Sequence, residues 1–231
     1  MATDAERTAQ EQITERTRVV LRPLAGPMSL GFLGLAGATF VVAGLNLGWV
    51  AASEQKKVAL IVIAFTVPLQ LIASIIGFLA RDGVAATAMG LLSGTWLAQA
   101  LVLVTSPPKA TSDALGLFLL LAMVAIWVPA SSALTSKLVP VAVLGTAGIR
   151  FGVTGMYQLT GSDAWKQAAG VIGILLAALA VYAAYAAEWE DVTKRTVLPF
   201  GRRGRGATAI SGTYAQQIDE LAHEPGVRSQ L

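Results

Sequence analysis

The residue whose type and position carry the most chemical information in this sequence is Arg150. It lies within the otherwise apolar run GTAGIRFGVTG. If this run crosses a bilayer, an arginine near its middle costs about 2.5–3.5 kcal/mol and marks a functional site by default. Two interpretations stay open. The guanidinium donates to helix carbonyls and to side chains such as Gln70 or Gln99, or it faces an aqueous vestibule and attracts anions.

Other reactive side chains are scarce. Cysteine is absent, and the only histidine, His223, lies in the polar C-terminal segment. Disulfides, thiolate nucleophiles and cysteine-bound metals are therefore excluded. The sequence also has no Ser/His/Asp set, no phosphate-binding glycine loop after a strand and no paired carboxylates. We expect a protein that is not an enzyme, with no cofactor, no metal and no nucleic-acid partner.

Acidic residues are missing from the long apolar stretches. The acidic residues closest to these stretches lie at the predicted ends of the spans: Asp82, Asp113, Asp163 and Glu188. Because proton-coupled carriers usually relay protons through an intramembrane Asp, Glu or His, their absence favours a channel or facilitator over an obligate proton symporter. A substrate that carries its own proton, such as acetic acid, escapes this argument.

Long apolar stretches must position these residues. Of 231 residues, 55% are hydrophobic and 13% are charged, against about 25% charged in soluble domains. A helix of about 20 apolar residues crosses a bilayer core, so the sequence predicts an all-α, polytopic membrane protein with six transmembrane helices. The spans are expected near 28–50, 58–80, 84–106, 114–135, 138–160 and 168–187. The predicted organisation is an N-terminal segment (1–27), a transmembrane domain (28–188) and a C-terminal tail (189–231).

The distribution of Lys and Arg predicts the orientation. Twelve of the 17 Lys and Arg residues lie on the side of the membrane that carries the termini, and four lie on the other side. The remaining one is Arg150, within a span. Both termini are therefore expected in the cytoplasm, at a bacterial inner membrane. Residues 5–22 are compatible with a helix on the membrane surface, and 214–222 with a short helix. The cluster Arg202-Arg203-Gly204-Arg205 suits anionic lipid headgroups or serves only as an orientation signal.

Glycines recur along the first, third and fifth predicted spans. In lipid, such stripes let helix backbones approach closely, either within a protomer or between protomers. A smooth wall for a narrow pore is the second interpretation. The glycines are Gly31, Gly34, Gly37, Gly44, Gly90, Gly94, Gly145, Gly148, Gly152 and Gly155.

Three segments form a recognisable set. The first span opens with Gly26, Pro27, Met28, Ser29, Leu30 and Gly31. The second and third spans contain Gln70, Asp82, Thr87, Ala88 and Trp96. The last span is followed by Arg195-Thr196-Val197-Leu198-Pro199-Phe200-Gly201. Over about residues 26–201 the chain resembles the acetate uptake transporters, which are the succinate–acetate permeases and their fungal Gpr/Fun/YaaH relatives.

Some positions depart from the family pattern. Gly26 and Ser29 replace an Asn and a Pro of the first box, and Phe65-Thr66-Val67 replaces a Tyr-Gly-Gly. Gly77 replaces an acidic residue, and Arg150 stands where the family usually has an apolar one.

The resemblance implies a homohexameric ring in which each protomer has a narrow pore for a small monocarboxylate such as acetate. A hydrophobic constriction would close each pore, at Leu35, Leu92 and Thr146 or Ala147. Residues implied to line the pore or contact the substrate are Asn46, Gln70, Thr87, Trp96 and Arg150. The box implied at the pore entrance comprises Gly26, Pro27, Ser29, Leu30 and Gly31.

Two other functions are compatible with the sequence. The first is a channel for small neutral solutes such as urea, amides or ammonia. The second is a non-transporting membrane scaffold, in which Leu35 and Leu92 would be packed shut and deletion of 206–231 would abolish the function. A pore-lining Arg150 favours anions over neutral solutes.

Overall fold

The computed structural model describes residues 24–193 and 195–212. Within these residues the regular structure is helical, apart from one isolated bridge between Lys137 and Arg202. Six segments are long and apolar enough to cross a membrane. The predicted all-α class and six spans are therefore confirmed. The helices predicted within 5–22 and 214–222 lie outside the described residues.

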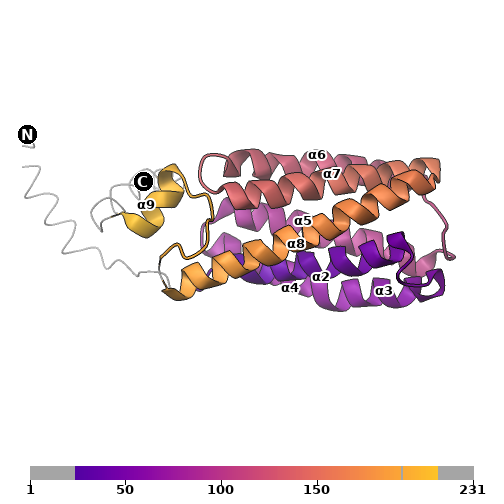
Figure 1. Ribbon diagram of the computed structural model, residues 1–231, viewed down its shortest axis with the longest axis horizontal. Coiled ribbons are helices and arrows are strands. Elements are labelled where there is room, and N and C mark those ends of the chain that lie inside the picture. The colour runs from indigo at the N-terminus through magenta and orange to yellow at the C-terminus, as the bar shows by residue number, and fades with distance from the viewer. Residues whose placement is uncertain (1–23, 194, 213–231) are drawn as a thin grey trace, which may run out of the picture.

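The spans follow one another along the chain (Figure 1). The first is α2 (Met28–Leu47). The second is composite, running from η1 (Ala52–Glu54) and α3 (Gln55–Ile61) through the π-helical η2 (Val62–Thr66) to α4 (Val67–Leu79). The others are α5 (Gly83–Thr105), α6 (Asp113–Ala133), α7 (Leu138–Thr160) and α8 (Asp163–Thr193). A short helix, α9 (Gly204–Ser211), comes last.

Two helical spans extend beyond their predicted apolar limits. The second begins at Ala52 instead of 58, and the last runs over Asp163–Thr193 instead of 168–187. Asp163 lies in the first turn of α8, where a negative charge is favourable beside the helix N-terminus. Hydropathy locates only the lipid-facing part of a helix, and a helix continues into polar sequence where capping and neighbours permit.

The middle of the second span contains a turn of π-helix that the sequence did not predict. η2 ends two residues before Pro68, which has no backbone N–H and crowds the carbonyl one turn earlier. The wider turn relieves that conflict, and π-bulges are frequent at functional sites. The hydroxyl of Thr66 donates to the carbonyl of Gly34 at 2.8 Å, which fixes this turn against α2. In the sequence, Pro68 was the signal that could have indicated this turn.

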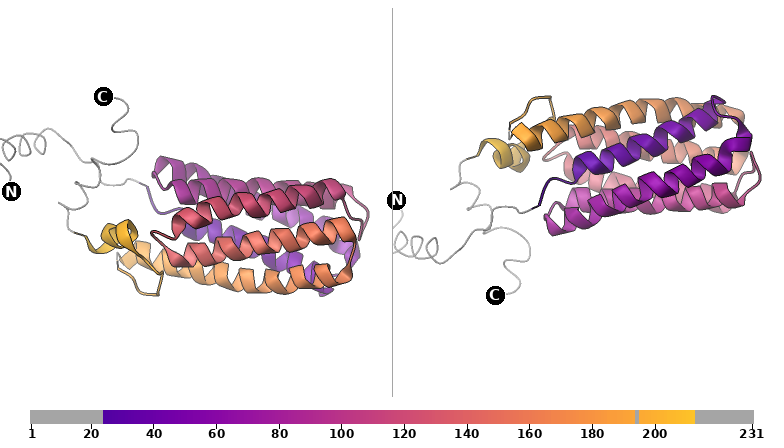
Figure 2. Two further views of the ribbon diagram at one scale, coloured as in Figure 1. Left: turned by 90° about the horizontal axis from the view of Figure 1, so that it is seen from above. Right: turned by 90° about the horizontal axis from the view of Figure 1, so that it is seen from below.

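The six spans close into a ring. Each packs against the next along the chain, and α2 packs against both α4 and α8, which completes the circuit. Figure 2 shows this bundle from two opposite sides. The start of α2, the finish of α8 and α9 lie at one end of the bundle (Figure 1), here called the tail end. The opposite end, where α2 finishes and α8 begins, is called the distal end.

The ring interior is tightly filled, whereas its outer surface is apolar. Leu35 and Leu92 are fully buried, while Phe78 and Leu121 are 63% and 66% exposed. Large exposed apolar side chains on every face are unfavourable in water and suit contact with lipid. The outward pattern supports a multi-pass membrane protein.

Close helix approach at glycines is confirmed. A methyl group at Gly155 of α7 would come within 2.9 Å of the carbonyl oxygen of Gly116 in α6, and one at Gly31 of α2 would meet the sulfur of Met89 in α5. Small residues in these places let backbones and large side chains approach each other.

The segment after α8 folds back onto the tail end. Tyr182 donates its hydroxyl to the carbonyl of Pro199 at 2.8 Å, and Phe200 is only 2% exposed. Arg202 pairs with the buried carboxylate of Glu190 and lies over the Phe200 ring. Arg202 is therefore engaged within the protein, whereas its neighbour Arg203 is exposed.

Candidate functional site

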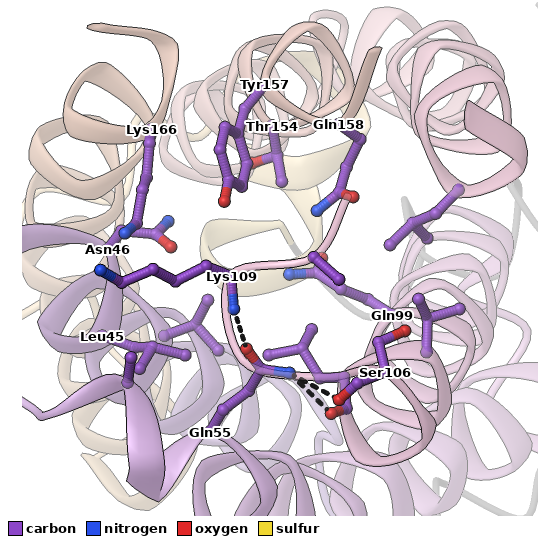
Figure 3. Close-up of a pocket in the computed structure, with 16 residues that line it drawn as sticks. Leu45, Asn46, Gln55, Gln99, Ser106, Lys109, Thr154, Tyr157, Gln158 and Lys166 are labelled. Atoms are coloured by element: carbon purple, nitrogen blue, oxygen red, sulfur yellow. Dashed lines mark hydrogen bonds between the residues drawn. The ribbon is translucent and has the colours of Figure 1, made fainter. Parts of the chain in front are cut away.

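A pocket opens at the distal end of the ring. It comprises about 620 Å³ of space, part of which is open solvent, and it is lined by residues of α2, η1, α3, α5, α6, α7, α8 and the loop between α5 and α6. Among the described residues, its lining contains polar and basic side chains but no acidic one. Figure 3 shows the ten labelled members converging on this space. They are Leu45, Asn46, Gln55, Gln99, Ser106, Lys109, Thr154, Tyr157, Gln158 and Lys166.

The rim of this pocket is fixed by two buried glutamines. Gln55 donates from Nε2 to the carbonyls of Leu103 at 2.9 Å and Ser106 at 3.3 Å, and its Oε1 accepts from the backbone N–H of Lys109 at 3.3 Å. Gln158 accepts from the backbone N–H of Ser112 at 2.9 Å. The loop between α5 and α6 is therefore tied to α3 and α7.

Gln99 and Thr154 form the floor of the pocket, and the next turn toward the tail end carries Trp96 and Arg150. Arg150 is fully buried, and its guanidinium carbon lies 4.9 Å from the centre of the Trp96 ring. Trp96 also packs edge-to-face on Phe151, with ring centres 6.0 Å apart. We call Thr39, Trp96 and Arg150 the arginine layer, since each lies one turn below a pocket residue on its own helix.

Gly173 of α8 makes room for the guanidinium. A methyl group there would come within 3.1 Å of Nε of Arg150 and 3.5 Å of the carbonyl oxygen of Thr39. Arg150 therefore reaches from α7 across the ring, between α8 and the Trp96 side chain of α5.

Several buried polar atoms of this region have no hydrogen-bond partner among the described residues. In the part of the chain that the structure describes, none of the three guanidinium nitrogens of Arg150 has a hydrogen-bond acceptor. The polar atoms without a partner there also include Thr39 Oγ1, Trp96 Nε1, Gln99 Oε1 and both side-chain amide atoms of Gln70. Burying an unpaired charge is costly unless a counter-charge or hydrogen bonds compensate. The guanidinium of Arg150 therefore makes none of the hydrogen bonds to Gln70, Gln99 or helix carbonyls that the structural interpretation expects. Cation–π contact with Trp96 supplies only part of the compensation.

The predicted constriction lies one further turn toward the tail end. Leu35, Leu92 and Ala147 are all fully buried, and they precede Thr39, Trp96 and Arg150 by three or four residues, about 5–6 Å along a helix. Gln70 reaches this level too, because its side chain lies beside Gly34. Thr146 is half-buried and donates its hydroxyl to the carbonyl of Ala142, so Ala147, of the two alternatives, occupies the interior.

The remaining predicted residues lie at the two ends or outside. Asn46 lines the distal pocket. Pro27, the second residue of the entrance box, is the N-cap of α2 at the tail end. Ser29 and Leu30 of the box are half-buried, and Gly31 packs on Met89. A methyl group at Gly26 would lie 4.0 Å from the carboxyl carbon of Asp191. Thr87 is on an exposed face of α5 and does not join the interior column.

Sequence reasoning missed several members of this region. Thr39 lies four residues after Leu35 on the same face of α2, and that spacing was the signal that could have found it. Lys109 and Lys166 entered only as orientation charges. Nothing in the sequence pattern places these two lysines, 57 positions apart in the numbering, in one pocket.

The fold and the site together define a multi-pass α-helical membrane protein with a polar pocket leading to a buried, unpaired cation inside a six-helix ring. The model of the GPR1/FUN34/yaaH family matches residues 9–200, and the chain belongs to this family. A solved structure described as that of the bacterial acetate channel SatP is 25% identical and has a TM-score of 0.69, covering 77% of this chain and 99% of that chain. No curated protein sequence matches the chain.

Proposed function

We propose that this chain is a membrane channel or transporter for acetate and related small monocarboxylates, with one narrow pathway inside each six-helix protomer. The observation that carries the proposal is Arg150, a fully buried guanidinium without an acceptor among the described residues, one turn below a pocket open at the distal end. A carboxylate supplies the missing charge and two acceptor oxygens, which match the planar guanidinium fork. The likeness to a bacterial acetate channel supports the same substrate class.

The pathway runs through three levels. A carboxylate enters the distal pocket, where Asn46 and Tyr157 replace part of its water shell. It then moves down one turn to the guanidinium of Arg150, between Trp96 and the backbone beside Gly173. Its methyl group faces the next level, the apolar constriction. Channels combine such polar stations with a hydrophobic constriction.

In this proposal the constriction is closed, and the burial of Leu35, Leu92 and Ala147 supports that state. Passage therefore needs side-chain movement at this level. The tail end then receives the solute near the box at Gly26–Gly31.

Burial of Leu35 and Leu92 is also what a scaffold would show. A scaffold, however, gains nothing from an interior arginine without an acceptor, because replacing such a group by an apolar one removes a desolvation cost. A neutral amide would satisfy Gln70 and Thr39 but would leave the guanidinium charge uncompensated. Arg150 therefore favours an anion over both alternatives.

The assembly and orientation are part of the proposal. The family resemblance supports a homohexamer, and the exposed Gly94 and the half-buried Gly145, with open space where a side chain would be, suit close contact between protomers. The excess of Lys and Arg on the tail side supports cytoplasmic termini in a bacterial inner membrane.

The test is uptake of radiolabelled acetate and of radiolabelled urea into proteoliposomes that contain the purified protein. We expect saturable acetate uptake that propionate inhibits, and urea uptake no faster than in protein-free vesicles. Urea uptake without acetate uptake would establish the neutral-solute channel. Uptake of neither by folded protein would contradict transport and favour a scaffold.

A further inference from the structure

The distal pocket holds two cations with no acidic counterpart. Lys109 comes from the loop between α5 and α6, and Lys166 comes from the start of α8; both line the pocket, whose lining has no Asp or Glu. Neither ammonium forms an ion pair with a described residue. Asp163 lies three positions before Lys166, but it is exposed and outside the lining.

The position of Lys109 is built into the fold. Its backbone has φ of 67°, a left-handed conformation that is unfavourable for a residue with a side chain. The buried Gln55 maintains it by accepting the backbone N–H of Lys109 while donating to the end of α5. Strained backbone that a buried side chain maintains is typical of functional sites. Figure 3 shows the Lys109 side chain extending across the pocket mouth toward the side where Asn46 and Lys166 lie.

The pocket also offers neutral hydrogen-bond donors next to the charges. The amide of Asn46 and the hydroxyl of Tyr157 line the same space, and both side chains are only half-buried. Two ammonium groups, an amide and a phenol surround a volume that fits a small organic anion with a few waters.

We infer that the distal pocket is a separate carboxylate-capture site, in which Lys109 and Lys166 concentrate small organic anions above the arginine layer and Gln55 positions Lys109. The inference rests on the proposed function, in which the pocket supplies the anion to Arg150. It adds where and how that anion is first bound. Charges of one sign around a cleft with low-dielectric walls raise the local concentration of counter-ions. Salt screens this attraction over about 8–10 Å.

The experiment compares acetate uptake at low and high concentrations of an impermeant salt, for the wild type, Lys109→Gln and Lys166→Gln. At low salt, each variant is expected to raise KM about two- to fivefold with little change in maximal rate, from Coulomb attraction at roughly 5–8 Å in a watery pocket. High salt should raise the wild-type KM toward those of the variants. Lys56→Gln is the matched control, because Lys56 is an exposed lysine beside Gln55 at the same end and lies outside the lining.

Gln55→Leu tests the positioning role. It leaves both lysines in place, so a KM increase similar to that of Lys109→Gln is expected. Adding Gln55→Leu to Lys109→Gln should raise KM by less than it does in the wild type. Equal KM values and equal salt dependence in wild type, Lys109→Gln, Lys166→Gln and Lys56→Gln would overturn the inference while leaving the proposed function intact.

If the wild type takes up no acetate, the proposed function fails and binding decides the inference. Acetate binding to the purified protein is then measured by saturation-transfer NMR. A signal in wild type and Lys56→Gln that is lost in the Lys109→Gln/Lys166→Gln double variant supports the capture site; no signal, or one that the double variant keeps, overturns it.

Discussion

The guanidinium of Arg150 lies over the face of the Trp96 ring, 4.9 Å from its centre. The two residues come from α7 and α5, helices that are not neighbours in the ring, so their contact crosses its interior. The opposite face of this interior is α8, where Gly173 leaves space for Nε. An aromatic face attracts a cation without consuming its N–H donors, and the donors of Arg150 have no acceptor among the described residues.

The Arg150–Trp96 contact should be measurable as a coupling energy. A buried cation–π pair contributes about 2 kcal/mol, so Trp96→Leu should lower the free energy of unfolding in detergent by more in the wild type than in an Arg150→Leu background. A double-mutant cycle isolates the difference. Equal effects of Trp96→Leu in both backgrounds would show that the ring acts only through packing.

The apolar constriction should control which solutes pass. Leu92→Ala removes part of a fully buried side chain beside Leu35 and Ala147, so we expect faster acetate uptake and entry of larger monocarboxylates such as butyrate. Leu97→Ala makes the same change on the exposed face of the same helix and should leave selectivity unchanged. If both variants show the wild-type ratio of butyrate to acetate uptake, Leu92 is not at the constriction.

The C-terminal segment should detach from the bundle when its ion pair is broken. Arg202→Gln leaves the carboxylate of Glu190, which is 3% exposed, without its partner, and breaking a buried pair is expected to cost about 3–5 kcal/mol locally. Limited proteolysis should then cleave near residues 195–203 faster than in the wild type. The exposed neighbour gives the control, Arg203→Gln, which should be cleaved at the wild-type rate; equal cleavage of the two variants would contradict the importance of the Glu190–Arg202 pair.

Much of the fold followed from the sequence because hydropathy and charge record where lipid begins and ends. The six spans, and close packing at residues such as Gly155, needed no tertiary information. The extra turns at both ends of α8 were missed because polar residues outside lipid continue a helix without an apolar signal. The π-turn before Pro68 was missed because hydropathy does not distinguish helix types.

The site was less predictable, because it depends on which side chains meet across the ring. Arg150 was recognisable from its cost in lipid, and Trp96 from the family resemblance, but their contact was not. Thr87 was assigned to the pore from the same resemblance, whereas its helix face points outward. The pairing of Lys109 with Lys166 depends on a loop conformation that Gln55 maintains, which no local pattern indicates.

The most direct test of the account is acetate uptake by Arg150→Leu, measured together with its thermal stability in detergent. Because the guanidinium has no acceptor, its replacement should leave stability unchanged or raise it, by up to about 1–4 kcal/mol. Uptake should fall at least tenfold, since each lost charge-assisted hydrogen bond to the carboxylate is worth about 1.5–3 kcal/mol, and Arg150→Lys should keep part of it. Wild-type acetate uptake in a stable Arg150→Leu protein would contradict an anion pathway through Arg150.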